Sequence, residues 1–290
     1  MTEMRIDLHT HSNMSDGTDT PEELAVAAAR AGLDVVALCD HDTMAGVSAA
    51  QASGERCGVI VQSGLETSTQ FGDSTVHLLG YGCDPDEPAL SSALAHVRLS
   101  REQRIPRMVD ALERVGIVVS LEDIAAQTAP GATSGRPHVA DAMVARGVVP
   151  SRREAFDYWL EWGKPGYVGH YRIPLIDGIA LIQGAGGVAV IAHPWGHGTR
   201  HLLTSEVLVE LAHEHGLDGL EVDHNDHDET ARAELRHLAA AHGLLATGSS
   251  DYHGLGKTRH PLGCNTTDPD VFDAIVDLIQ TRRHTLEATP

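Results

Sequence analysis

The stretch Ile6-Asp7-Leu8-His9-Thr10-His11 carries the first information about the fold. It predicts a short strand over residues 5–8, and two histidines follow that strand at alternate positions. Alternate side chains that leave a strand can reach one metal ion from the turn that follows. The segment therefore predicts a strand that delivers metal ligands at its carboxyl end.

A regular alternation of strands and helices extends outward from this segment. The next helix is expected from Thr20, with Pro21 in its first turn and Glu23 as a capping carboxylate, to a stop at Gly32. Further strands are expected at residues 34–39, 58–61, 75–79, 187–192, 218–222 and 244–248, and further helices at residues 43–56, 205–215, 229–242 and 269–283. About seven βα units around one core predict a distorted α/β barrel related to the eightfold type.

The alternation stops between the fourth and fifth predicted strands. Residues 84–172 have a helical pattern without a buried strand, with a cap at Ser120 and Asp123, a stop at Gly147 and a kink or boundary at Pro106. We therefore expect an inserted helical cap at residues 85–172. The barrel would then consist of residues 1–84 and 173–290.

The composition of the chain disfavours some classes of binding partner. The chain of 290 residues has a net charge of −20 and only 4% aromatic residues, so duplex DNA and membrane surfaces are poor partners. The sequence has no signal peptide and no long apolar run, and its four cysteines form no C-x-x-C pair, so we expect a cytoplasmic protein with reduced thiols. Cys39 is expected to be a small core residue. The 19 histidines are the unusual feature.

Potential metal ligands concentrate at the ends of the predicted strands. A lone histidine at such a position is more often hydrogen-bonded scaffolding than a ligand. Packing gives no reason, however, for many histidines and carboxylates to gather where the ends of parallel strands converge. The candidate metal ligands are His9, His11, Asp16, His41, Glu66, His77, His193, Asp251 and His253.

The motifs that contain these residues resemble those of the PHP (polymerase and histidinol phosphatase) superfamily. They are Asp7-Leu8-His9-Thr10-His11-Ser12, Ser15-Asp16-Gly17, Asp40-His41-Asp42, Gly64-Leu65-Glu66, Ala192-His193-Pro194 and Ser250-Asp251-Tyr252-His253-Gly254. The resemblance implies a distorted (β/α)7 barrel and a phosphoesterase with two or three divalent cations, Mn²⁺, Fe²⁺ or Zn²⁺.

The resemblance also implies how the ligands divide among the metals. His9, His11, Glu66 and Asp251 would hold one ion and the hydroxide that attacks the phosphorus, and these four are the expected catalytic residues. Glu66, His77 and His193 would hold a second ion. Asp16, His41 and His253 would hold a third.

The expected cap contains a candidate anion site. Ser134-Gly135-Arg136-Pro137-His138 begins a helix, and a helix N-terminus beside an arginine binds anions readily. This segment and residues 163–168 resemble a PHP branch with nucleoside 3′,5′-bisphosphate phosphatases and a 5′-to-3′ exoribonuclease, and residues 221–227 resemble its rim. The expected substrate contacts are Arg136, His138, Lys164, Tyr167 and His227.

Arg101, Arg104 and Arg107 lie three residues apart on one predicted helix of the cap. They are expected to form a solvated face of that helix. His237, His242 and His284 are expected on the surface of helices, and His260 is left undecided.

These expectations favour a phosphomonoesterase of small nucleotides, acting on nucleoside 3′,5′-bisphosphates, AMP-like substrates or oligonucleotide 5′-ends. Another phosphate ester, such as a sugar phosphate, histidinol phosphate or cyclic phosphodiester, is the alternative within the same chemistry. A metal-dependent amidohydrolase is less favoured, because neither of the two lysines, Lys164 and Lys257, is expected to bridge metals. A non-catalytic accessory module remains a further alternative.

Overall fold

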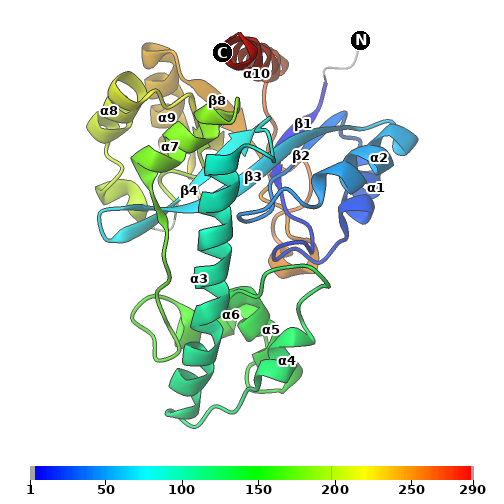
Figure 1. The fold of residues 1–290 in the computed structure, drawn as a ribbon, viewed down its shortest axis with the longest axis vertical. Coiled ribbons are helices and arrows are strands. Elements are labelled where there is room, and N and C mark those ends of the chain that lie inside the picture. The colour runs from blue at the N-terminus through cyan, green and yellow to red at the C-terminus, as the bar shows by residue number, and fades with distance from the viewer. Residues whose placement is uncertain (1–3, 197, 289–290) are drawn as a thin grey trace.

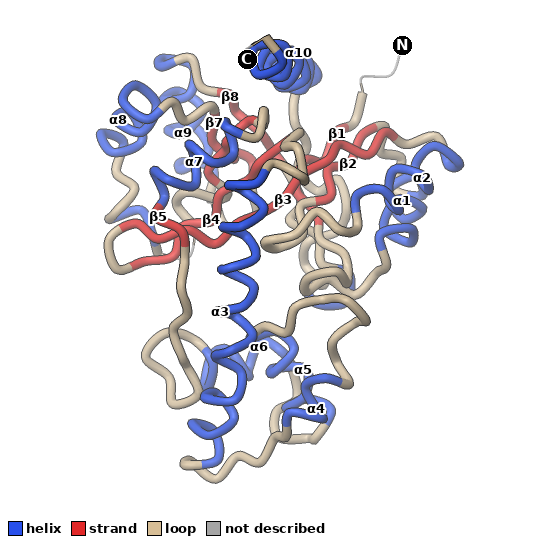
Figure 2. Tube along the Cα trace, viewed as in Figure 1, coloured by secondary structure: helices blue, strands red, loops and turns tan. Residues whose placement is uncertain are grey.

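The computed structural model describes residues 4–196 and 198–288, which form an α/β barrel with helices around it (Figures 1 and 2). The strands are β1 (Ile6–Thr10), β2 (Val35–Leu38), β3 (Ile60–Phe71), β4 (Ser74–Tyr81), β5 (Ile173–Pro174), β6 (Val188–Ile191), β7 (Gly219–Asp223) and β8 (Leu245–Gly248). The α-helices are α1 (Pro21–Arg30), α2 (Val47–Cys57), α3 (Pro88–Glu113), α4 (Leu121–Ala125), α5 (Arg136–Ala145), α6 (Arg152–Ala155), α7 (Leu175–Gly184), α8 (Ser205–His215), α9 (Glu229–His242) and α10 (Pro269–Glu287). Three shorter helical segments are η1 (Phe156–Leu160), η2 (Thr199–His201) and η3 (Gly254–Lys257).

The main sheet has the strand order β1-β2-β3-β4-β6-β7-β8, and the short β5 pairs with β3. The sheet nearly closes, because Thr10 at the end of β1 bridges Tyr252 beyond β8, and the backbone N–H of His11 donates to the carbonyl of Tyr252 at 2.8 Å. The predicted α/β barrel with seven main strands is therefore confirmed. Closure brings the carboxyl ends of distant strands to one rim.

One strand and one connection differ from the expectation. The third strand was predicted at residues 58–61, but β3 extends to Phe71 and turns directly into β4, which is antiparallel to β3 and β6. Gly64 therefore lies within a strand and does not end one. A Cβ atom at this position would lie 2.6 Å from the Cys39 sulfur, so close packing against β2 requires glycine.

The helix signals were largely correct. Thr20 and Glu23 form the expected capping box at the start of α1. The second helix begins at Val47, after the predicted start at residue 43. Pro106 neither ends nor divides α3, which continues through it.

Helices α3 to α6 and η1 lie in sequence between β4 and β5 and extend away from the barrel (Figure 1). They have a hydrophobic cluster of their own, whose buried members lie between Ile105 and Leu160. The barrel is filled by other clusters, which draw on strands β1 to β8 and on helices such as α7 and α10. The division into a barrel and a cap at residues 85–172 stays a prediction, and this separate cluster is consistent with it.

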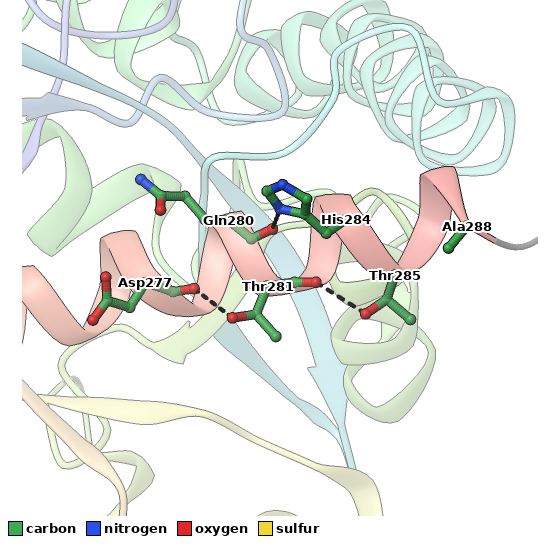
Figure 3. A pocket seen from close by; sticks show the side chains of 6 residues that line it. All are labelled: Asp277, Gln280, Thr281, His284, Thr285 and Ala288. Atoms are coloured by element: carbon green, nitrogen blue, oxygen red, sulfur yellow. Dashed lines mark hydrogen bonds between the residues drawn. The ribbon is translucent and has the colours of Figure 1, made fainter.

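A broad hollow of about 810 Å³ lies along α10, lined by Asp277, Gln280, Thr281, His284, Thr285 and Ala288 (Figure 3). Its polar groups bond within the helix: the Thr281 hydroxyl donates to the carbonyl of Asp277 and the Thr285 hydroxyl to that of Thr281. None of the candidate metal ligands lines this hollow, so it has no part in the site described below. Within the described chain, no helix combines the length and the hydropathy of a membrane span.

Tyr81 offers a test of barrel packing. Its side chain is fully buried at the end of β4, and its hydroxyl donates to the carbonyl of Leu8 in β1 at 2.9 Å. We expect Tyr81→Phe to lower the free energy of unfolding by about 1–3 kcal/mol, because a buried carbonyl loses its donor. Urea denaturation measures the change. Tyr158→Phe, at a tyrosine that is 61% exposed, is the control and should change nothing.

Candidate metal centre

All nine candidate ligands come together at the carboxyl rim of the barrel. Their ligand atoms form three overlapping groups within the described chain: His9, His11 and Asp251; His11, Asp16, His41 and His253; and Glu66, His77 and His193. His11 belongs to two of these groups, whereas the sequence predicted it in one. The structure thus assembles the predicted set, with a slightly different division.

Glu66 in β3 lies at the centre of this arrangement. Its Oε1 lies 2.8 Å from Nδ1 of His77 and 3.6 Å from Nε2 of His193. Its Oε2 lies 3.0 Å from Nδ1 of His41 and 3.3 Å from Nε2 of His11. A carboxylate with each oxygen directed at a different set of imidazoles has the geometry of a bridging ligand.

Asp251 faces the same centre from the other side of the barrel opening. Its Oδ1 lies 3.5 Å from Nε2 of His11 and 3.7 Å from Nε2 of His9. Those two imidazole nitrogens lie only 3.0 Å apart. Asp251 and His193 have positive φ angles of 52° and 29°, which non-glycine residues adopt rarely and mostly at functional sites.

The loop after β1 supplies the third group. Asp16 Oδ1 lies 3.2 Å from Nε2 of His253, and Asp16 Oδ2 lies 3.7 Å from Nε2 of His41. Gly17 allows this loop to close, because a Cβ atom there would lie 2.5 Å from the carbonyl oxygen of His11. Arg152 of α6 holds the loop from outside by donating to the carbonyl of Asp16 at 3.1 Å.

Carboxylates and imidazoles are buried together at the centre and shift one another's pKa values. Burial alone would raise the pKa of Glu66 and Asp16, but the surrounding histidines outweigh it and hold both pKa values well below the ordinary range. Burial opposes protonation of His9, but Glu221, Glu66 and Asp251 together raise its pKa well above 6.5. Burial, helped by the charge of Lys257, lowers the pKa of His253 to about 4.

These residues fit divalent cations. Nδ1 of His11 and Nδ1 of His41 are buried and make no hydrogen bond to any described residue. The facing nitrogens of His9 and His11 cannot both carry a proton at their separation, so at least one lone pair points into the centre. Imidazole and carboxylate donors without thiolate suit Mn²⁺, Fe²⁺ and Zn²⁺.

Glu221 of β7 supports the centre and was not among the predicted site residues. It is fully buried and accepts from Nδ1 of His9 at 3.0 Å, from the backbone N–H of His193 at 2.8 Å and from the Ser249 hydroxyl. It therefore fixes the imidazole of His9 so that Nε2 faces the other ligands. A charged residue within an otherwise apolar strand was the signal that could have revealed it.

Three acidic residues of the motifs hold the loops and do not face the centre. Asp40 accepts from the hydroxyls of Ser12 and Ser15, each at 2.6 Å, and burial raises its pKa to about 6. Burial also raises the pKa of Asp7 to about 6. Asp42, with a positive φ of 56°, forms an ion pair of 2.6 Å with Arg101.

The prediction of a solvated arginine face on α3 was wrong for two of the three residues. Arg101 is tied to Asp42, and Arg104 is only 4% exposed. Arg107 is exposed, as expected. The helix turns this stripe toward the barrel, which its sequence spacing could not indicate.

His224 after β7, and Lys257 and His260 after β8, also lie beside the centre and were not among the predicted site residues. His224, Asp251 and His260 form a fourth group of potential ligands, with Nε2 of His224 at 3.3 Å from Asp251 Oδ2. Lys257 Nζ lies 2.5 Å from that same oxygen, as an ion pair. Lys257 thus adjoins the centre, although it forms an ion pair and does not bridge as a carboxylated lysine would.

Among the predicted substrate contacts, Arg136 and Lys164 are at least partly exposed, whereas His138 is buried. Arg136 lies over the rings of Phe156 and Tyr167, at 5.6 and 5.7 Å, and pairs with Glu161. Lys164 is exposed. His138 is buried, and its Nδ1 accepts the N–H of Gly135 at the start of α5.

His227 is held by backbone groups on both ring nitrogens. Nδ1 donates to the carbonyl of Val222 at 2.8 Å, and Nε2 accepts from the N–H of Trp195 at 3.2 Å. This arrangement leaves no ring nitrogen for a substrate.

Other minor predictions agree with the structure. Cys39 is fully buried, the four cysteines are free, and His237 and His284 are exposed. His242 is partly exposed and its ring packs against His213.

The chain is similar to known proteins. The PHP domain model matches residues 7–116. A 3′,5′-nucleoside bisphosphate phosphatase of Chromobacterium violaceum is 36% identical over 277 residues, which cover 96% of this chain and 97% of that protein. The chain belongs to the PHP family. The resemblance inferred from the motifs is thus confirmed.

Other PHP relatives cover most of their own length as well. A 5′-3′ exoribonuclease of Haemophilus influenzae is 32% identical, over 86% of this chain and 90% of that protein. A phosphoribosyl 1,2-cyclic phosphate 1,2-diphosphodiesterase of Eggerthella lenta is 33% identical, over 88% of this chain and 96% of that protein. A solved structure from Bifidobacterium adolescentis, named a metal-dependent phosphoesterase, has a TM-score of 0.91 and 38% identity, covering 95% of this chain and 96% of that one.

Glu221 provides a test of how the centre is held. Both of its carboxylate oxygens accept hydrogen bonds, so the amide of Glu221→Gln must place its NH₂ group against a donor. We expect metal affinity to fall by about ten- to a hundredfold. Competition with a chelator, followed by metal analysis, measures the change. Glu214→Gln, at an exposed position, is the control. Unaltered affinity in Glu221→Gln would show that Glu221 only supports the barrel.

Proposed function

We propose that the nine side chains hold two or three divalent cations and that the protein is a hydrolase of phosphate monoesters of small nucleotides. The observation that carries the proposal is the convergence of five imidazoles and one buried carboxylate on a single point, at Glu66. Membership of the PHP family places this centre in a class of metal-dependent phosphoesterases. When bound, the cations would lower the pKa of water and neutralise the phosphoryl oxygens.

The residues of the chain then have distinct tasks. His9, His11, Glu66 and Asp251 would hold one ion next to the reacting phosphoryl group. Glu66, His77 and His193 would hold a second ion, so Glu66 would be a ligand of both. Glu221 keeps His9 in one orientation, so the centre is preorganised before substrate binds. Asp16, His41 and His253 would complete the third position. The mostly buried ligands exclude bulk water from all sides but the opening of the barrel.

Small nucleotides are the substrates that we favour. The C. violaceum relative is named for nucleoside 3′,5′-bisphosphates and the H. influenzae relative for RNA 5′-ends, and both align over most of their length. Arg136, Lys164, Tyr167 and His138 would contact the part of the nucleotide that is remote from the metals. We leave His227 out of this set because both of its ring nitrogens are occupied. The charge of −20 disfavours duplex DNA as a partner, and four free cysteines agree with a cytoplasmic location.

A cyclic phosphodiester is the second candidate substrate, because the E. lenta relative is named for one. Amide hydrolysis with a carboxylated bridging lysine has no support, since Lys257 forms an ion pair with Asp251 and Lys164 is exposed.

Metal dependence is the first test of the proposal. We expect the purified protein to carry more than one equivalent of transition metal, and His9→Ala combined with His11→Ala to lose that metal and at least about a thousandfold in kcat/KM. Circular dichroism should show an intact fold. His237→Ala, at an exposed histidine, is the control. A metal-free wild-type protein with full activity in chelator would overturn the proposal.

Substrate preference is the second test. We expect kcat/KM for a nucleoside 3′,5′-bisphosphate to exceed that for glucose 6-phosphate by at least about tenfold, because one charged contact to a second phosphate contributes about 1.5–3 kcal/mol. Phosphate release with added Mn²⁺ measures both values. For a ribose 1,2-cyclic phosphate, chromatography of the monophosphate formed by ring opening measures the matching value. A higher value for the sugar phosphate or the cyclic ester would exclude the nucleotide assignment while leaving the metal centre intact.

A further inference from the structure

Four cationic or imidazole side chains gather beside the metal centre, where α3 and residues 169–172 meet the β3–β4 hairpin. Arg104 Nη1 lies 3.0 Å from Nδ1 of His170. Arg101 donates to the Ser68 hydroxyl at 3.2 Å, in addition to its ion pair with Asp42. Arg172 donates to the Thr75 hydroxyl at 2.5 Å. We refer to Arg101, Arg104, His170 and Arg172 as the arginine cluster.

The hairpin register places this cluster next to the candidate ligands. Ser68 pairs directly with His77, and Gln70 pairs with Thr75. Because side chains alternate along a strand, Glu66 and Ser68 share one face of the hairpin with His77 and Thr75. Arg101 therefore binds the hydroxyl of Ser68, two residues after the candidate ligand Glu66. Arg172 binds the hydroxyl of Thr75, two residues before the candidate ligand His77. Arg104 lies three residues after Arg101 on α3, which is about one helical turn.

Every unpartnered atom of the cluster is a hydrogen-bond donor. Nε of Arg101, Arg104 and Arg172 is buried and has no partner among the described residues, and the same holds for Nε2 of His170. A guanidinium can only donate, so Nδ1 of His170 accepts from Arg104 and the ring proton lies on Nε2. Because the unpaired groups of the cluster are all hydrogen-bond donors, only a ligand that accepts hydrogen bonds can satisfy them.

The cluster also has more positive charge than its carboxylate partners balance. In the described chain Arg104 has no ion pair, and its neighbours include Arg101 and Arg136. Burial and then these two arginines lower the pKa of Arg104 well below its ordinary value. Burial and then Arg104 lower the pKa of His170 to about 2, so this imidazole is neutral. In a chain with a net charge of −20, such a concentration of cations needs a reason.

We propose that the arginine cluster is a second anion subsite, in which Arg104 and the Nε2–H of His170 bind the phosphate of the substrate that is not hydrolysed. The inference rests on the proposed function and makes it specific: the substrate carries two phosphate groups about one sugar apart. A terminal phosphate dianion matches the charge of Arg104 and Arg172 better than the single charge of a phosphodiester does.

The subsite differs from the predicted contact at Arg136. The Arg136 guanidinium is partly neutralised by Glu161, at 3.3 Å, and its Nη1 also donates to the carbonyl of Leu160. Arg104 has no such competitor and is far more deeply buried, so we expect it to contribute more to the binding of the second phosphate.

The experiment compares wild type with Arg104→Met in the full-length, metal-loaded protein. We expect kcat/KM for a nucleoside 3′,5′-bisphosphate to fall by about ten- to a hundredfold, and that for the matching monophosphate to fall by no more than a few-fold. Arg114→Met, at an exposed arginine directly after the same helix, is the matched control and should leave both values unchanged. Equal losses on both substrates would overturn the subsite.

Stability separates a ligand site from a structural contact. Met removes an unbalanced buried charge, so we expect Arg104→Met to have an unaltered or higher Tm, whereas a structural arginine would lower it by several degrees. Inorganic sulfate should raise the Tm of wild type and Arg114→Met more than that of Arg104→Met. A lower Tm in Arg104→Met with an unaltered response to sulfate would refute the subsite. This readout needs no turnover, so it remains decisive even if no phosphoester is hydrolysed.

Discussion

The burial of Glu66 among five imidazoles is the constraint on which the rest of the structure depends. A carboxylate with almost no exposure is stable only if donors or positive charge surround it, and the histidines in or directly after β1, β2, β4 and β6 surround Glu66. The strands must therefore converge on this one point. The barrel meets that requirement because it brings the carboxyl ends of distant strands together.

Strand β4 runs antiparallel to its neighbours, and this departure from a regular parallel barrel brings a histidine to Glu66. His77 lies on β4, which runs antiparallel to β3, and reaches Glu66 across the hairpin from the position opposite Ser68. Diagonal neighbours on one face of an antiparallel pair are close enough for long side chains to meet. A helix between the two strands would have placed His77 elsewhere. The long β3 thus supplies both the central carboxylate and the partner strand that brings it an imidazole.

The helices between β4 and β5 bring charged side chains to the rim of the candidate metal centre. Arg98 and Arg101 of α3 both bind Asp42, at 2.6 Å, and Arg152 of α6 holds the Asp16 loop. These contacts fix the helices relative to the rim, so in the proposed function charged groups on them would meet a substrate at a defined distance from the reacting phosphate. A preorganised distance between two anion sites is how a protein selects doubly phosphorylated substrates over singly phosphorylated ones.

The sequence by itself determined the nine candidate ligands, the α/β barrel and the capping of α1, because each depends on local spacing: a histidine after a strand, or a glutamate three residues after a threonine. Only the tertiary structure decided the length of β3, where Gly64 is required by the approach of Cys39 from another strand. Tertiary packing also decided that Arg104 is buried and that Glu221 and Lys257 adjoin the ligands. In each case the partner is distant in sequence: Glu221 meets His9 across 212 residues, and Arg104 meets His170 across 66. A local pattern shows that such a residue is charged, but only the folded chain shows whether water, a carboxylate or a substrate balances that charge.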